Sequence, residues 1–173
     1  VQGFDLEAIK SIASNPNHLE VGADFYASPF NAGCAVNQLD AVILGATEID
    51  TDFNVNVVTG SDGVIMGGSG GHAAAAAGAK VTIVVANLLR GRLPIIVDKV
   101  LTATTPGETI DVLVTERGIA VNPLRADLKE KMLAAGLPVK DIQELKELAE
   151  KIAGVPKQIK TGEKIVAVVE YRD

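Results

Sequence analysis

Four short runs of aliphatic residues place the strongest constraint on how this chain of 173 residues can fold. They are rich in Val, Ile and Leu, and their length and β-branched character are typical of strands buried on both faces of a parallel sheet. The four runs are Ala41–Leu44, Val81–Val85, Ile95–Val100 and Ile110–Val114. Several buried strands in one chain predict an α/β layered domain.

Two further segments have strand character, and three have helical character. Asn54–Val58 alternates polar and apolar residues, as a half-exposed strand does, and Lys164–Val169 is a strand-like run near the end of the sequence. Helices are expected over Leu6–Ile12, Asn122–Gly136 and Asp141–Gly154. A capping residue and a closing glycine bound each of the last two. With no linker and no internal repeat, the pattern favours one domain, a largely parallel sheet flanked by helices.

Composition excludes several classes of partner. Sixteen Lys and Arg against 22 Asp and Glu give a net charge of −6, whereas nucleic acids and anionic membranes favour an excess of cations. The most apolar run, Val81–Leu89, is less than half as long as a bilayer requires. The single cysteine, Cys34, cannot form an internal disulfide, which fits a reducing cytoplasm. We therefore expect a cytoplasmic protein that binds neither nucleic acid nor membrane.

The strongest chemical signal is a glycine-rich stretch, Gly63–His72, which a run of alanines follows. Glycines allow positive φ and let a ligand approach bare backbone, so that successive amides can converge on an anion or oxyanion. A helix that starts in the alanines would place its positive end at the same point. We therefore predict catalytic roles for Gly68, Gly70 and Gly71, with Ser69 contacting substrate. The alternative is a tight turn between strand and helix that binds nothing.

Other interpretations of the same region also have to be weighed. His72 is a candidate donor to a developing oxyanion or partner of a carboxylate, although a lone histidine is as often an ordinary loop residue. Gly68–Ala73 matches G-x-G-x-x-A, but the next strand lacks the acidic residue that a ribose hydroxyl needs, so a nicotinamide-dependent oxidoreductase is a remote alternative. Gly-Lys-Ser/Thr is absent, which excludes a P-loop. The acidic residues within Glu48–Asn54 are typical of a solvated strand end, and we expect no metal site.

Cations follow two of the predicted strands. Arg90 and Arg92 come after Val81–Val85, and Arg117 comes after Ile110–Val114. Ligands of open α/β sheets bind outside the carboxyl ends of the strands, and guanidinium groups suit carboxylates and phosphates. These arginines are therefore candidates for holding a small anion. The alternative is that each one only solvates the end of a loop.

Five segments occur here in a distinctive order: Leu44–Val57, Gly60–Gly63, Gly68–His72, Arg90–Pro94 and Val114–Pro123. Together they resemble the citrate lyase alpha chain family of the CoA-transferase superfamily. The likeness spans nearly the whole chain, and the joint occurrence of the segments is far more specific than any one alone. It implies an α/β fold of the CoA-transferase type and identifies the chain as the C-terminal half of a longer alpha chain.

The resemblance also implies an activity, that of a citrate:acyl-carrier-protein transferase in anaerobic citrate breakdown. Acetyl-carrier protein and citrate would exchange acyl groups to give citryl-carrier protein and acetate, and a beta subunit would then cleave the citryl thioester. The implied partners are the beta and gamma (acyl-carrier) subunits and the chain's own N-terminal half. The carrier's thioester sits on a CoA-like phosphopantetheine arm, which is a substrate, so no tightly bound cofactor is expected. A citramalate lyase alpha chain and a catalytically silent assembly half are the alternatives.

The family motifs also carry the predicted site, in which the glycine stretch stabilises an oxyanion. The side chains expected to bind substrate, beyond that stretch, are Asn54, Asn56, Arg90, Arg92, Glu116 and Arg117. The Ser-Glu-Asn-Gly motif of CoA transferases that form a glutamyl thioester is absent, which implies direct attack of a citrate carboxylate on the thioester. Where the family pattern has an Asp, this chain has Ala73–Ala77, so no role of that Asp carries over.

Overall fold

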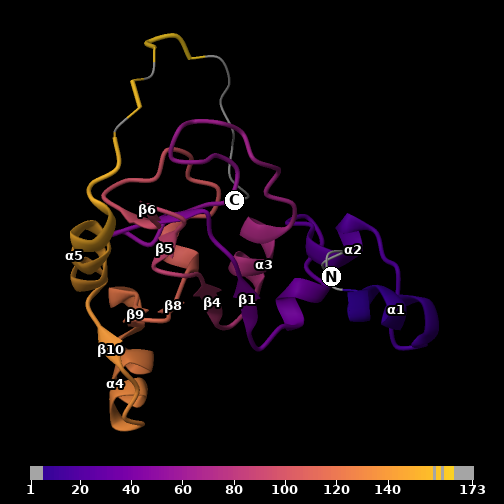
Figure 1. The fold of residues 1–173 in the computed structure, drawn as a ribbon. Helices are drawn as coiled ribbons and strands as arrows, with labels where there is room; N and C mark the ends of the chain where they lie inside the picture. Colours follow the sequence, from indigo (N-terminus) through magenta and orange to yellow (C-terminus); the bar gives the residue numbers. More distant parts are fainter. Residues whose placement is uncertain (1–5, 158, 161, 166–173) are drawn as a thin grey trace.

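The structure of the chain is a computed structural model that describes residues 6–157, 159–160 and 162–165 (Figure 1). Five strands form its central sheet, namely β1 (Val42–Leu44), β4 (Thr82–Val85), β8 (Val112–Thr115), β9 (Gly118–Val121) and β10 (Val139–Lys140). They lie in the order β1-β4-β8-β9-β10, and every neighbouring pair is parallel except the antiparallel pair β8 and β9. The predicted largely parallel sheet is therefore confirmed.

A second, smaller sheet packs beside the first. Its middle strand, β2 (Glu48–Asp50), pairs antiparallel with β3 (Val55–Asn56) and parallel with β7 (Ile96–Val97). A separate two-stranded hairpin is formed by β5 (Leu89–Arg90) and β6 (Leu93–Pro94). The two residues between its strands include Gly91, whose φ of 61° is the left-handed conformation that glycine adopts without strain.

Helices flank the sheets, as predicted. The α-helices are α1 (Leu6–Ser14), α2 (Ala23–Ala27), α3 (His72–Gly78), α4 (Ala126–Ala134) and α5 (Ile142–Ala153), and the 3₁₀ turns are η1 (Ala35–Gln38), η2 (Gly107–Thr109) and η3 (Pro123–Arg125). Figure 1 shows α5 beside β9 and α3 near β1, with α1 and α2 beyond α3. Among the described residues, no helix combines the length and apolar character that crossing a membrane requires.

The predicted helix ends are confirmed where local chemistry sets them. The Asp141 side chain accepts a hydrogen bond from the amide of Gln143 (2.9 Å), and Gly154 ends α5 with a φ of 83°. The Asn122 side chain likewise accepts from the amide of Leu124 (3.0 Å), but the turn that it caps is η3, and α4 begins only afterwards.

Two strand predictions need correction, and a third falls mostly on residues that the structure does not describe. The run Ile95–Val100 forms only the two-residue β7, because the chain then turns and the Val100 amide donates to the Asp50 carboxylate (3.3 Å). The segment Asn54–Val58 forms only β3, and both residues of β3 are buried rather than half-exposed. The predicted strand Lys164–Val169 lies mostly outside the described residues, and the two of its residues that are described form no strand.

The larger of two apolar cores lies between the two sheets and α5, and a smaller one gathers Ala27, Cys34, Val36 and Ala75. The central sheet contributes Val84, Leu113 and Ala120, which lie opposite one another across β4, β8 and β9 and therefore point to the same face. Ile49 and Ile96 reach the same core from β2 and β7, and α5 adds the apolar side of its helix, including Leu145 and Ala149. The core therefore joins both sheets and α5 into one unit.

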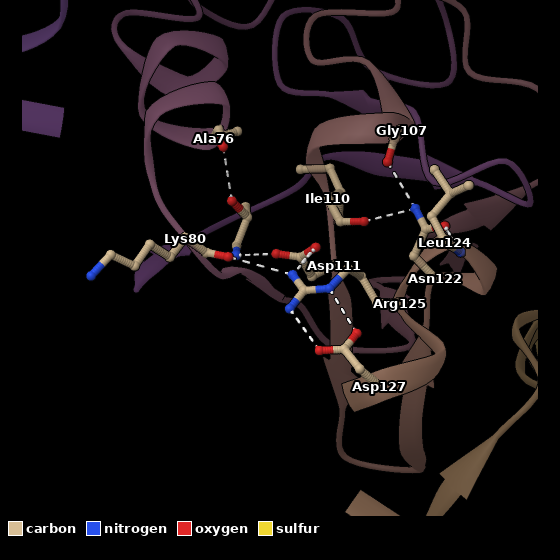
Figure 2. A network of polar contacts seen from close by, with 10 residues as sticks. Ala76, Lys80, Gly107, Ile110, Asp111, Asn122, Leu124, Arg125 and Asp127 are labelled. Atoms are coloured by element: carbon tan, nitrogen blue, oxygen red, sulfur yellow. Dashed lines mark hydrogen bonds and ion pairs between the residues drawn. The ribbon is translucent and has the colours of Figure 1, made fainter. Parts of the chain in front are cut away.

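A polar network lies where β4 and β8 begin, at the end of the central sheet opposite to the carboxyl ends of these two strands (Figure 2). The buried Asp111 carboxylate accepts from the amide of Thr82 (2.6 Å) and from the Arg125 guanidinium (2.6 Å). Arg125 also binds Asp127, and these two carboxylates raise the pKa of the guanidinium above its ordinary value. The network fixes the register at which β4, β8 and the start of α4 meet.

Gly107, in η2, joins the two sheets. Its amide donates to the Asn54 side chain (2.9 Å), and its carbonyl accepts from the Asn122 side chain (2.8 Å), as Figure 2 shows for the second bond. A Cβ atom at this position would lie 1.9 Å from the carbonyl oxygen of Asp52. Because the clashing atom belongs to the backbone, only glycine fits here.

We therefore predict that Gly107→Ala lowers the free energy of unfolding by about 3 kcal/mol, the upper end of the usual cost of overpacking. Urea unfolding followed by circular dichroism measures this change. Gly45→Ala is the matched control, because a Cβ there would meet no atom within 4 Å. Equal stability of the two variants would show that the sheets do not depend on this close contact.

Candidate active site

The glycine-rich stretch forms an exposed loop between a hairpin and α3. An isolated bridge pairs Thr59 with Ile65, and the Met66 amide donates to the Val58 carbonyl (2.7 Å). Gly67–Gly71 connects this hairpin to α3, and Gly71 is the N-cap of α3. The φ of 53° at Gly70 is a conformation that other residues rarely adopt.

The backbone of this loop is unusually accessible. Within the described part of the chain, none of the five amides of Gly67–Gly71 donates to a protein acceptor. A Cβ atom at Gly67, Gly68 or Gly70 would meet no atom within 4 Å, whereas one at Gly71 would lie 2.9 Å from the Tyr26 ring. The loop therefore presents open N–H groups to which an anionic oxygen can bind.

His72 fastens the end of the loop to the rest of the structure. Its Nε2 lies 2.9 Å from the Gly45 carbonyl oxygen, which can only accept, so Nε2 carries the proton. In the neutral ring, Nδ1 then accepts from the Thr105 hydroxyl (2.6 Å). Burial lowers the pKa of the His72 ring. Both nitrogens are engaged within the protein, so His72 positions the loop and offers no free N–H beside it.

The structure brings Arg90 to the glycine loop. Its guanidinium Nη1 lies 3.7 Å from the Met66 sulfur, directly before Gly67, and the side chain is exposed. Arg92, across the turn of the same hairpin, is also exposed. The hairpin thus places two cations at the carboxyl end of β4, and Arg90 contacts the residue that directly precedes the loop.

Glu116 and Arg117 occupy the turn between β8 and β9, at the same edge of the sheet. The Glu116 carboxylate accepts from the amide of Leu88 (2.9 Å), which ties this turn to the start of the β5–β6 hairpin. The Arg117 Nε lies 3.9 Å from Glu116, and both side chains are exposed. Glu116 therefore orients the arginine-bearing hairpin as well as facing solvent.

Of the two predicted asparagines, Asn54 is half-buried and Asn56 lies inside the protein. Asn54 donates to both oxygens of Asp50 (3.2 and 3.1 Å) while its own oxygen accepts from Gly107. Asn56 is fully buried, and its amide donates to Glu48 (3.1 Å) and to Thr59. Because no atom of Asn56 is exposed, the predicted contact of Asn56 with substrate does not fit this structure. Both asparagines support the loops that surround the site.

Comparison with known proteins places this geometry in a family. The family model described as citrate lyase, alpha subunit, matches residues 1–173. The chain belongs to the citrate lyase alpha subunit family. It is 53% identical over 172 residues to the citrate lyase alpha chain of Klebsiella pneumoniae, covering 99% of this chain and 34% of that one. It is 55% identical over 173 residues to the corresponding chain of Haemophilus influenzae, covering 100% of this chain and 35% of that one. The chain thus spans about a third of the length of these curated relatives.

A solved structure of the same family has the same fold. It is a crystal structure described as the alpha subunit of citrate lyase from Streptococcus mutans, in complex with citrate. It is 52% identical to this chain with a TM-score of 0.89, and the match covers 98% of this chain and 33% of that one. The family predicted from the five motifs is therefore confirmed.

The sequence did not indicate that two acidic residues of the small sheet, Glu48 and Asp50, are buried and support the loops around the site. Glu48 and Asp50 are only 4% and 1% exposed, so the prediction of a solvated strand end is wrong for these two residues and holds only for Asp52. The antiparallel register of β2 and β3 sets Glu48 opposite Asn56, which supplies the amide donor that a buried carboxylate needs. A polar residue at equivalent positions of two consecutive short strands is the signal that could have indicated this pair. Among the described residues, no three His, Cys, Asp or Glu side chains gather as a metal site requires.

The lowered pKa of His72 predicts a pH dependence of stability. Because the folded chain holds this ring neutral below its ordinary pKa, the stabilisation is complete above about pH 6.5 and is lost as the pH falls through the lower folded value. Urea unfolding between pH 8 and pH 5 should show a steeper loss for the natural chain than for His72→Gln. His18→Gln, which removes an exposed histidine, should keep the natural profile, and an identical profile for His72→Gln would contradict the assignment.

Proposed function

We propose that this chain supplies the oxyanion-binding loop of a citrate:acyl-carrier-protein transferase, as the C-terminal part of a longer alpha chain. The observation that carries the proposal is the set of five loop amides without an acceptor among the residues that the structure describes, in a chain that belongs to the citrate lyase alpha subunit family. The citrate in the related Streptococcus mutans structure supports a tricarboxylate as the substrate.

The reaction begins when a carboxylate oxygen of citrate attacks the carbonyl carbon of the acetyl thioester. The carbonyl electrons move onto its oxygen, and the loop amides donate hydrogen bonds to the negative charge that develops there. Expulsion of the thiolate leaves a mixed anhydride. The thiolate then attacks the citryl carbonyl of this anhydride, which releases acetate and forms the citryl thioester. No general base is required, because carboxylates are ionised at neutral pH.

Preorganised amides suit this chemistry because donors that are already fixed stabilise an oxyanion without having to reorganise as it forms. Arg90 stands beside them and can bind a citrate carboxylate through two parallel hydrogen bonds. Arg92 and Arg117 lie at the same edge of the sheet and can bind further carboxylates or the phosphates of a CoA-like arm. The site thus separates two tasks, with neutral donors for the reacting oxygen and cations for the rest of the substrate.

The remaining parts of the proposal follow from the family. The thioester would arrive on the phosphopantetheine arm of the gamma (acyl-carrier) subunit, and a beta subunit would cleave the citryl product. The N-terminal part of the alpha chain would share the active site. The setting would be anaerobic citrate breakdown in the cytoplasm.

A substitution in the loop tests this function in a full-length alpha chain that carries this sequence. Gly68→Val places a side chain in open space, so the fold is preserved while access to the amides is blocked. We expect exchange of labelled acetate into a CoA-type thioester to fall by about 100-fold, the effect of losing one oxyanion donor in known enzymes.

Gly162→Val is the matched control, since a Cβ there also meets no atom within 4 Å, and its exchange rate should be unchanged. An unchanged rate in Gly68→Val would remove the loop from the mechanism. Absence of exchange in the natural full-length chain would favour a role in assembly alone.

A further inference from the structure

A tyrosine from an early part of the chain lies against the last residue of the glycine loop. A Cβ atom at Gly71 would lie 2.9 Å from Cε1, 3.6 Å from Cδ1 and 3.9 Å from Cζ of the Tyr26 ring. One edge of the ring therefore faces Gly71. The phenolic hydroxyl is attached to Cζ, only two bonds from the ring atom that comes closest to the loop. The fold thus brings a polar side chain of α2 to the end of the loop that presents the open amides.

The position of Tyr26 is set by contacts that leave its hydroxyl unused. Ala27, the next residue of α2, is buried in the smaller core together with Val36 and with Ala75 of α3, so that core holds α2 beside α3. After α2 the chain turns back, and the Asn31 side chain donates to the Asp24 carbonyl (3.2 Å). Apolar packing and backbone hydrogen bonds therefore place the ring at the start of α3.

The Tyr26 hydroxyl is available to a ligand. The residue is 38% exposed, and its hydroxyl forms no hydrogen bond with any residue that the structure describes. A phenolic hydroxyl is a neutral group that can donate one hydrogen bond. It lies beside Gly71, the last of the five loop residues whose amides have no acceptor among the described residues. Tyr26 therefore adds a neutral donor from a second element of the fold.

We propose that the Tyr26 hydroxyl donates a hydrogen bond to the oxyanion that the loop amides bind, an inference that rests on the proposed function. Tyrosine side chains serve as oxyanion donors alongside backbone amides, because a fixed neutral donor strengthens its bond as charge develops on the acceptor. The proton stays on Tyr26 throughout, and the bond weakens again when the carbonyl re-forms and the thiolate leaves. Tyr26 is then a catalytic residue that acts on the transition state rather than on the bound substrates.

The test is Tyr26→Phe in the full-length alpha chain, which removes the hydroxyl and keeps the ring against Gly71. In the exchange of labelled acetate into a CoA-type thioester, we expect kcat to fall by about tenfold, the effect of one hydrogen bond to a charged group. KM for the thioester and the melting temperature should be unchanged. Ser14→Ala, which removes an exposed hydroxyl from α1, should keep the natural kcat. A natural kcat in Tyr26→Phe, or an effect on KM alone, would overturn the proposal.

A second variant tests the same contact from the side of the loop. Gly71→Ala pushes the Tyr26 ring aside, and the negative φ of −87° at Gly71 lets alanine occupy the position. Gly71→Ala should therefore lower kcat by a larger factor in the natural chain than in Tyr26→Phe, and equal factors would contradict the proposal. Gly68→Val separates the two proposals. If it lowers exchange while Tyr26→Phe does not, only the role of Tyr26 fails, whereas absence of exchange in the natural full-length chain would overturn both.

Discussion

The contact on which the rest of this structure depends is the approach of two backbone segments at Gly107. There the small sheet and the central sheet come so close that a single methyl group would overlap the Asp52 carbonyl. Side-chain amides hold the junction on both sides, Asn54 from the small sheet and Asn122 from the end of β9. Because Asn54 also binds Asp50, which in turn accepts from the Val100 amide, one chain of hydrogen bonds runs from the central sheet into the loops around the candidate site.

The open loop follows from this rigid frame. Thr105, two residues before Gly107, exchanges backbone hydrogen bonds with Val55 and binds the His72 ring through its hydroxyl. His72 therefore connects the start of α3 to both sheets, since Gly45 follows β1 of the central sheet. A loop that is fixed at both ends can leave its amides without protein acceptors and still hold them in one arrangement. Exposure of the backbone and rigidity of its supports are thus compatible here.

The parts of the fold that local physics sets could be predicted from the sequence. Aliphatic runs gave β1, β4 and β8, and the caps at Asp141 and Gly154 bounded α5, because each signal lies within a few residues of the element that it controls. The family could be predicted from the order of its motifs. The end of β7 at Val97 could not be predicted. It depends on the hydrogen bond from the Val100 amide to the Asp50 carboxylate, and these residues lie 50 positions apart in sequence. The burial of Glu48 and Asn56 likewise depends on the register of β2 against β3, which no local pattern specifies.

The acidic character of the chain explains why neutral donors matter at this site. A net charge of −6 opposes the approach of the proposed tricarboxylate substrate, and a cluster of cations strong enough to offset this charge would also hold the product tightly. Backbone amides avoid this conflict, because their dipoles act on charge only at short range and at the place where it develops. Neutral donors also stabilise the buried carboxylates of Glu48 and Asp50. Among the described residues, Asp50 accepts hydrogen bonds from amides, Glu48 accepts from an amide and a hydroxyl, and neither forms a salt bridge, so Arg90 and Arg92 stay available to an incoming anion.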